Sequence, residues 1–242
     1  MEKKIAVVTG ASTGIGLATC RELREDNYKV IAISRRATQS DGLHKYEDID
    51  KYDVDLRDEN QVKEIVEKIY SNYGKIDVLI NNAGIGLIKK LEETSLEEFN
   101  QQYEANMVTM FLMTREVIKN KNKDDFLHMV NTSSEAGVEG FATYSAYCAS
   151  KFAVTGFSEA IKDELKLENV KVDVICPGDV NTPFMEKCPI DKSLMDEYSI
   201  EVLDEEYMLK PEDVSNLIIN LLRLPKNVVM SHQKIQPVDN YY

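Results

Sequence analysis

The sequence predicts a single α/β domain in which a doubly wound parallel sheet forms the middle of three layers. Short, β-branched apolar runs alternate with amphipathic segments along the 242 residues. Strands separated by helical segments need crossover connections, which make a sheet parallel and cover both of its faces. No linker, low-complexity tract or internal repeat divides residues 1–242, so one domain fits better than two small ones.

Five apolar runs rich in β-branched residues predict strands, and a further short strand is expected just before Asp55. Each run ends in polar or glycine-containing residues. The runs are 4–10, 28–34, 75–84, 126–134 and 169–178. Ligands of such sheets gather beyond the carboxyl ends of the strands. The residues that close these runs are therefore the first candidates for function.

Apolar residues at helical spacing predict the helices between these strands. In residues 58–74, Val62, Ile65, Val66 and Ile69 share one face, and a glycine ends the segment. The other segments with helical pattern are 15–26, 95–120, 143–167 and 210–225. Residues 37–51 are few and polar, so only a reduced helix is expected there.

Charge and composition exclude several classes of function. The chain has 29 basic and 42 acidic side chains, a net charge of −13, which disfavours general binding to nucleic acid or to anionic membranes. The four cysteines and three histidines lie far apart, so no metal site is expected. The chain starts directly in a strand and has no apolar run of membrane-helix length, so we expect a cytoplasmic location.

The turn TGASTGIG, after the first strand, has the composition of a phosphate-binding turn. Glycine permits positive φ and lets the backbone approach a ligand, and the following helix offers free N–H groups to a diphosphate. The GK[ST] ending of a P-loop is absent. A tight turn without ligand is the alternative. We predict a dinucleotide site whose contacts are Gly10, Ser12, Thr13, Gly14, Ile15 and Gly16.

The stretch TYSAYCASKF puts two tyrosines on the helical edge of one lysine. Tyr144 lies seven residues before Lys151 and Tyr147 lies four before it. A nearby ammonium favours phenolate and lowers a tyrosine pKa from about 10. The preceding strand ends with Ser133 and Ser134, and strand alternation lets only one of them face a site. The residues alone do not decide which of the two tyrosines, or which of the two serines, belongs to the site.

Three motifs resemble the single-domain short-chain dehydrogenases/reductases: TGASTGIG, NNAG at 81–84 and YCASK at 147–151. They occur in that family's order and the resemblance covers nearly the whole chain. It implies a Rossmann fold and an oxidoreductase that interconverts a small alcohol and its carbonyl. The ending NVVMSHQKIQPVDNYY is similar to the subgroup of NADP-dependent serine and 3-hydroxy acid dehydrogenases and broad-range carbonyl reductases.

The resemblance also selects among the candidate catalytic residues. In the family, the active-site serine lies thirteen residues before the tyrosine, and this spacing pairs Ser134 with Tyr147. By resemblance Tyr147 is the acid/base, Lys151 lowers its pKa and orients the ribose, and Ser134 polarises the substrate oxygen. Asn106 supports a proton relay, although a satisfied core amide is the alternative. Tyr144 is expected to line the pocket or to begin the helix.

The end of the second strand favours NADP over NAD. Ser34, Arg35 and Arg36 stand where an acidic residue would bind ribose hydroxyls, and a guanidinium can hold a 2′-phosphate. A solvated basic pair is the alternative. The resemblance implies NADP (NADPH), held by Ser34 and Arg35 with Arg36 in support. It adds the cofactor contacts Asp55, Leu56, Asn82, Ala83, Gly84, Tyr147, Lys151, Pro177, Gly178, Val180 and Thr182.

Two further expectations concern the lid and the assembly. Residues 183–207, with two prolines and many acids, are expected to form a substrate lid. The family helix that corresponds to 143–167 packs across a two-fold axis, so a homodimer or homotetramer is implied. The rival functions are a cofactor-binding regulatory protein with little catalysis and a sugar-nucleotide epimerase. The short region after residue 178 leaves little room for the epimerase's substrate domain.

Overall fold

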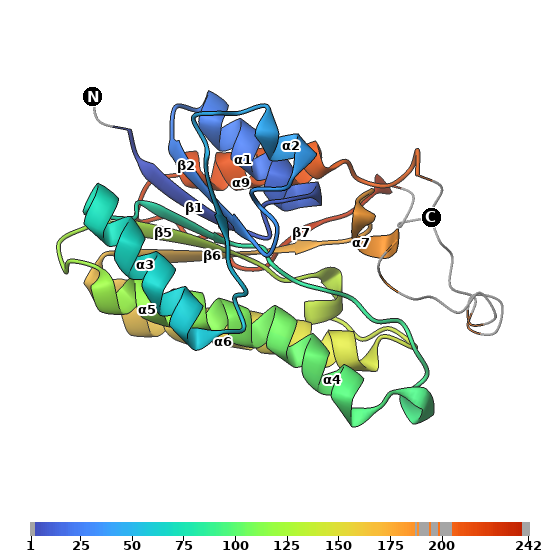
Figure 1. Cartoon of the computed structure of the whole chain (residues 1–242). Coiled ribbons are helices and arrows are strands. Elements are labelled where there is room, and N and C mark those ends of the chain that lie inside the picture. The colour runs from blue at the N-terminus through green and yellow to red at the C-terminus, as the bar shows by residue number, and fades with distance from the viewer. Residues whose placement is uncertain (1–2, 187, 189–193, 195–197, 199–204, 239–242) are drawn as a thin grey trace.

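A parallel sheet forms the middle layer of the molecule, as the sequence predicts. The computed structural model describes residues 3–186, 188, 194, 198 and 205–238. Within them, seven strands pair in parallel in the order β3-β2-β1-β4-β5-β6-β7 (Figure 1). The strands are β1 Ile5–Thr9, β2 Lys29–Ser34, β3 Asp50–Asp53, β4 Val78–Asn81, β5 Leu127–Thr132, β6 Val170–Pro177 and β7 Gln233–Ile235. The order reverses between β1 and β4, which is where such sheets bind ligands.

Helices cover both faces of the sheet. Figure 1 shows α3, α5 and α6 on one face and α1, α2 and α9 on the other. The longer helices are α1 Gly14–Glu25, α3 Glu59–Tyr73, α4 Leu96–Tyr103, α5 Thr109–Asn120, α6 Ser145–Leu165 and α9 Pro211–Arg223. Two short helices are α2 Asp41–His44 and α7 Pro183–Glu186, and α2 is the reduced helix expected in 37–51. Short 3₁₀ turns occupy Leu91–Glu93, Glu135–Gly137 and Lys166–Glu168.

Alternation along the strands divides the core in two. In β1, Val7 packs toward α3 and α5, whereas Val8 packs toward α1 and α9. Both side chains are fully buried. Strands buried on both faces read as unbroken apolar runs. This is why the strands could be found in the sequence.

The segment 95–120 differs from its prediction as one continuous helix. It is divided into α4, a π-helical turn at Glu104–Val108 and α5. A π turn adds one residue to the helical repeat and changes the direction of the side chains around it. Apolar spacing did not reveal it because a single extra residue barely disturbs the pattern. The turn contains Asn106.

Among the described residues, no helix combines the length and apolar character that crossing a bilayer requires.

Candidate active site

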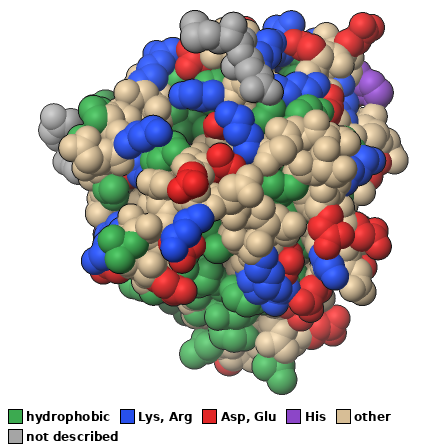
Figure 2. All heavy atoms as spheres, turned by 90° about the vertical axis from the view of Figure 1, so that its left-hand side faces the viewer, with side chains coloured by type: hydrophobic (Ala, Val, Ile, Leu, Met, Phe, Trp, Pro, Cys, Tyr) green, Lys and Arg blue, Asp and Glu red, His purple; other side chains and the backbone are tan. Residues whose placement is uncertain are grey.

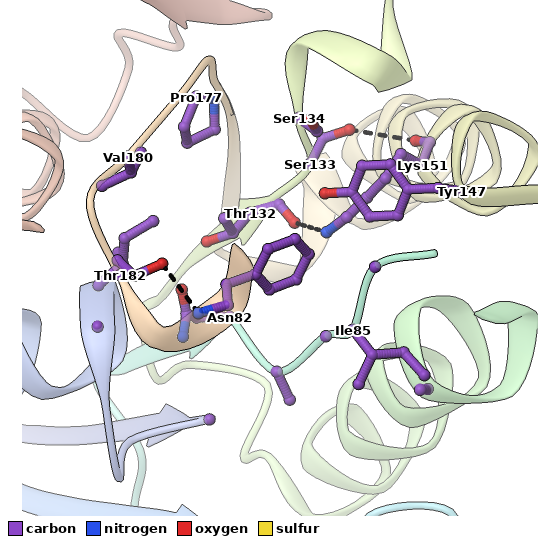
Figure 3. Close-up of a pocket in the computed structure, with 18 of the residues that line it drawn as sticks. Asn82, Ile85, Thr132, Ser133, Ser134, Tyr147, Lys151, Pro177, Val180 and Thr182 are labelled. Atoms are coloured by element: carbon purple, nitrogen blue, oxygen red, sulfur yellow. Dashed lines mark hydrogen bonds between the residues drawn. The ribbon is translucent and has the colours of Figure 1, made fainter. Parts of the chain in front are cut away.

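A cavity of about 930 Å³ opens beyond the carboxyl ends of the strands. Its wall combines the turn between β1 and α1, the ends of β2, β4, β5 and β6, and the first turns of α6 (Figure 3). The predicted residues that line it are Gly10, Ser12, Thr13, Gly14, Ile15, Ser34, Arg35, Asp55, Leu56, Asn82, Ala83, Gly84, Ser134, Tyr147, Lys151, Pro177, Gly178, Val180 and Thr182. The structure thus brings the predicted residues together, with the exceptions of Gly16 and Asn106.

The glycine turn is fixed against the end of β4. Gly10 has φ of +64°, and a β-carbon there would lie 2.8 Å from the Ala83 Cα, so only glycine fits. The Thr9 hydroxyl accepts hydrogen bonds from the backbone N–H groups of Asn82 and Ala83 at 2.9 and 3.1 Å. Gly16 is buried against the Gly10 carbonyl and serves helix packing, which is why it does not line the cavity.

One end of the cavity is basic. Ser34 is buried at the end of β2, while Arg35 and Arg36 are exposed beside it. Arg57 also lines this end, and its guanidinium contacts the Asp55 carboxylate at 2.6 Å. Hydrogen bonding to Arg57 lowers the pKa of Asp55 below its usual value. Sequence reasoning overlooked Arg57, although it follows two residues after Asp55 in VDLRD.

Tyr147 and Lys151 project from α6 into the opposite half of the cavity, as Figure 3 shows. Both are nearly buried, with 8% and 4% of their surfaces exposed. The Lys151 amine donates a hydrogen bond to the Thr132 carbonyl at 3.0 Å and lies 5.8 Å from the centroid of the Tyr147 ring. The two side chains are neighbours, as helical spacing predicted.

The pKa of Tyr147 differs from the expectation. Burial raises it above the usual tyrosine value, and a hydrogen bond with Ser134 only partly opposes that rise. Burial lowers the pKa of Lys151 from 10.5 to about 8. Desolvation disfavours each charged form, and the hydrogen bond with Ser134, not the Lys151 ammonium, is what opposes the rise of the tyrosine pKa. Tyr147 is therefore a neutral phenol at neutral pH.

The two serines that close β5 point in different directions. Ser133 Oγ donates to the Lys151 carbonyl at 3.1 Å and shares a hydrogen bond with Thr155 Oγ1 at 2.8 Å, so its hydroxyl is used inside the protein (Figure 3). Ser134 lines the cavity, and its hydroxyl accepts from the Ala136 N–H at 3.1 Å. Its hydrogen bond with Tyr147 joins the pair that the resemblance selected.

Asn106 lies behind the cavity wall, with only 2% of its surface exposed. Its Oδ1 accepts from the Ile85 N–H at 2.7 Å, and its Nδ2 donates to the Ile85 carbonyl at 3.0 Å and to Ser150 Oγ at 2.9 Å. Ser150 in turn donates to the Tyr147 carbonyl at 2.7 Å. Asn106 therefore connects the chain after β4 to the catalytic turn of α6. These contacts match the satisfied amide, and the proton relay stays a prediction.

Aromatic rings line the end of the cavity beyond Tyr147. The ring centroids of Phe141 and Tyr144 lie 6.1 Å apart, those of Tyr144 and Tyr147 lie 6.3 Å apart, and those of Tyr147 and Phe184 lie 6.0 Å apart. Tyr144 both lines the cavity and caps the amino end of α6, as predicted for it. The predicted lid at 183–207 lies mostly outside the described residues; of its described members, Phe184 and Tyr198 line the cavity.

Acidic side chains on this wall were not foreseen. Glu135, Glu139 and Asp179 line the cavity. Two of these positions could have indicated it, because Glu135 directly follows the predicted site residue Ser134 and Asp179 follows the Pro177-Gly178 turn. Sequence alone could not say which way these carboxylates point.

Comparisons with known proteins agree with this geometry. The family model for short chain dehydrogenases matches residues 4–192. The 3-oxoacyl-[acyl-carrier-protein] reductase FabG of Thermotoga maritima is 33% identical over 226 residues, which cover 91% of each chain. The closed form of a serine dehydrogenase complexed with NADP⁺ superposes with a TM-score of 0.86 at 28% identity, covering 98% of this chain and 96% of the other.

An alcohol dehydrogenase from Thermococcus sibiricus, complexed with 5-hydroxy-NADP, has a TM-score of 0.82 at 27% identity and covers 98% and 97% of the two chains. The chain belongs to the short-chain dehydrogenase family. It is accordingly an oxidoreductase with the Rossmann fold, as the three motifs predicted.

Proposed function

We propose that this protein is an NADP-dependent oxidoreductase that interconverts a small alcohol and its carbonyl by hydride transfer. The observation that carries the proposal is the meeting of Ser134, Tyr147 and Lys151 on one wall of a cavity that also reaches the glycine turn. A cofactor-binding regulatory protein would need only the glycine turn and the basic end. The complete catalytic wall therefore favours the enzyme.

The residues of the cavity fit NADP. The missing β-carbon of Gly10 leaves the turn open at the amino end of α1, where a diphosphate binds. The Thr132 hydroxyl is buried on the cavity wall and has no hydrogen-bond partner among the described residues. At the basic end, Ser34 and Arg35 would hold the 2′-phosphate, with Arg36 beside them. NADPH, when bound, supplies the hydride.

Tyr147 acts as the proton donor to the substrate oxygen in this proposal. Its raised pKa keeps the phenol protonated, which suits donation to a forming alkoxide. Ser134 donates a second hydrogen bond to the same oxygen, and Lys151 holds the ribose. Asn106 positions the turn of α6 through Ser150. The relatives named above support an alcohol or carbonyl substrate without identifying it.

Replacing Tyr147 with Phe tests the proposed chemistry. The variant removes the phenol proton and keeps the ring, so NADPH-dependent turnover should fall by about 100- to 10,000-fold, the usual contribution of a general acid. NADPH binding, followed by fluorescence titration, should change little. Retained turnover of a carbonyl panel by the variant would sink the assignment.

Replacing Arg35 with Ala tests the choice of cofactor. Loss of a charge-assisted hydrogen bond to the 2′-phosphate should weaken NADP binding by about 10-fold or more and leave NAD binding nearly unchanged. Titration calorimetry with both cofactors measures this. An unmodified protein that binds NAD more tightly than NADP would show the basic end to be only a solvated surface.

We also propose that the protein forms a homodimer or homotetramer through α4, α5 and α6. Figure 2 shows hydrophobic side chains gathered at the bottom of the molecule, the level at which these helices lie in Figure 1. Large apolar residues exposed on them are Leu96, Phe99, Tyr103, Phe111 and Phe152. An apolar face of this kind marks an association site.

A further inference from the structure

Asp179 is a carboxylate on the wall of the cavity. Its side chain makes no hydrogen bond or ion pair within the part of the chain that the structure describes. Burial alone raises its pKa above the usual aspartate value. Its backbone carbonyl accepts from the Leu209 N–H at 3.0 Å, and the Asn181 N–H donates to the Leu209 carbonyl at 2.8 Å. These two backbone hydrogen bonds to Leu209 hold the loop that carries the Asp179 side chain.

The other cavity carboxylates all have cationic partners. Asp55 pairs with Arg57 at 2.6 Å. Glu135 and Glu139 share Lys234, at 3.4 and 2.6 Å. Asp179 has no such partner among the described residues. A half-buried carboxylate without a partner lowers the stability of the fold, and such groups are typical of ligand-binding sites. Its carboxylate oxygens can therefore accept hydrogen bonds from a ligand.

Aromatic rings line the same cavity. Tyr144 and Asp179 line the same cavity, and the charge of Asp179 contributes to the raised pKa of Tyr144, after the larger effect of burial. Tyr144 stands between Phe141 and Tyr147 in the row of rings. A carboxylate beside aromatic faces is the combination that binds an ammonium group, by ion pairing and by cation–π attraction. An anionic substrate group would instead be repelled by the Asp179 carboxylate.

We propose that Asp179 determines specificity by receiving the ammonium group of a small amino alcohol, or of the matching amino carbonyl compound. This inference rests on the proposed oxidoreductase function and names its substrate class. It disfavours the 3-hydroxy acids that the carboxyl-terminal resemblance suggested.

A matched substrate series tests the proposal. 1-Amino-2-propanol, 1,2-propanediol, 2-butanol and 3-hydroxybutyrate share a secondary alcohol and differ in the charge and polarity of one terminal group. Following NADP reduction, kcat/KM for the amine should exceed that for 2-butanol by about 10- to 100-fold, the value of a hydrogen bond to a charged group. 3-Hydroxybutyrate should rank last. If kcat/KM for 1-amino-2-propanol does not exceed that for 2-butanol, the proposal is wrong.

The variant Asp179→Asn keeps the shape of the side chain and removes its charge. In this variant, kcat/KM for 1-amino-2-propanol should be within about threefold of kcat/KM for 2-butanol. Glu139→Gln is the matched control, since its carboxylate is already paired with Lys234, and it should keep the preference for the amine. A preference that survives Asp179→Asn, or that Glu139→Gln abolishes equally, contradicts the role of Asp179.

A binding measurement separates this inference from the proposed function. Calorimetric titration of 1-amino-2-propanol into the NADPH complex needs no turnover, and Asp179→Asn should weaken that binding by about 10-fold or more. Equal binding by both proteins, or none by the unmodified protein, overturns the ammonium site. Turnover of 2-butanol without any preference for the amine would leave the oxidoreductase intact and remove only the role of Asp179.

Discussion

At the scale of single residues, the candidate site places ionisable groups where their charged forms are disfavoured. Burial raises the pKa of Tyr147 and lowers that of Lys151 to about 8. Helical spacing predicted that Tyr147 and Lys151 are neighbours, which the structure confirms, but the expected tyrosine pKa was lowered rather than raised. That error has a physical reason: spacing shows which groups are neighbours, whereas the pKa depends on how much water the surrounding elements exclude.

Lys151 should make the free energy of unfolding depend on pH. The unfolded chain binds its proton up to pH 10.5, but the folded protein releases it near pH 8, so stability rises with pH between these values. Relative to Lys151→Met, the unmodified protein should gain about 3 kcal/mol across that window, since each pKa unit is worth about 1.4 kcal/mol. Below pH 8 the difference between the two proteins should be constant.

Urea unfolding of both proteins at several pH values measures this difference, because groups common to both cancel. Parallel stability curves between pH 8 and 10.5 would contradict the lowered pKa.

At the scale of elements, the long apolar and amphipathic segments were predictable and the short or irregular ones were not. The strands β1, β2, β4, β5 and β6 lie within their predicted ranges. β7 has three residues and none fully buried, too little pattern to recognise. The π turn at Glu104–Val108 was equally invisible. Its effect is local, because it directs Asn106 at the chain after β4 and at Ser150.

At the scale of the whole molecule, the exposed apolar face of α4, α5 and α6 predicts self-association. Placing a charge in the centre of that face should dissociate the oligomer, because a buried unpaired carboxylate is costly. Phe152, 46% exposed on α6, is the position to change, as Phe152→Asp. Light scattering coupled to size-exclusion chromatography should then report a lower mass than for the unmodified protein.

Val229→Asp provides the control for that experiment. Val229 is similarly exposed, at 40%, but lies in the segment before β7 and not on α4, α5 or α6. It should keep the mass of the unmodified protein. A monomeric unmodified protein, or a Phe152→Asp variant of undiminished mass, would contradict association through this face.

The sequence by itself determined the alternation of strands and helices and the parallel sheet, and its resemblance to the family selected Ser134, Tyr147 and Lys151 as the predicted catalytic residues. These follow from local periodicity and from motifs with fixed spacing. Only the tertiary structure decided that Asn106 lies behind the wall and that Arg57 is paired with Asp55. It also decided that Asp179 has no partner among the residues that the structure describes. The burial of Asn106 depends on contacts between segments far apart in the chain, which no local pattern encodes. The pairing of Asp55 with Arg57 is local, but the sequence alone does not say which way the two side chains point.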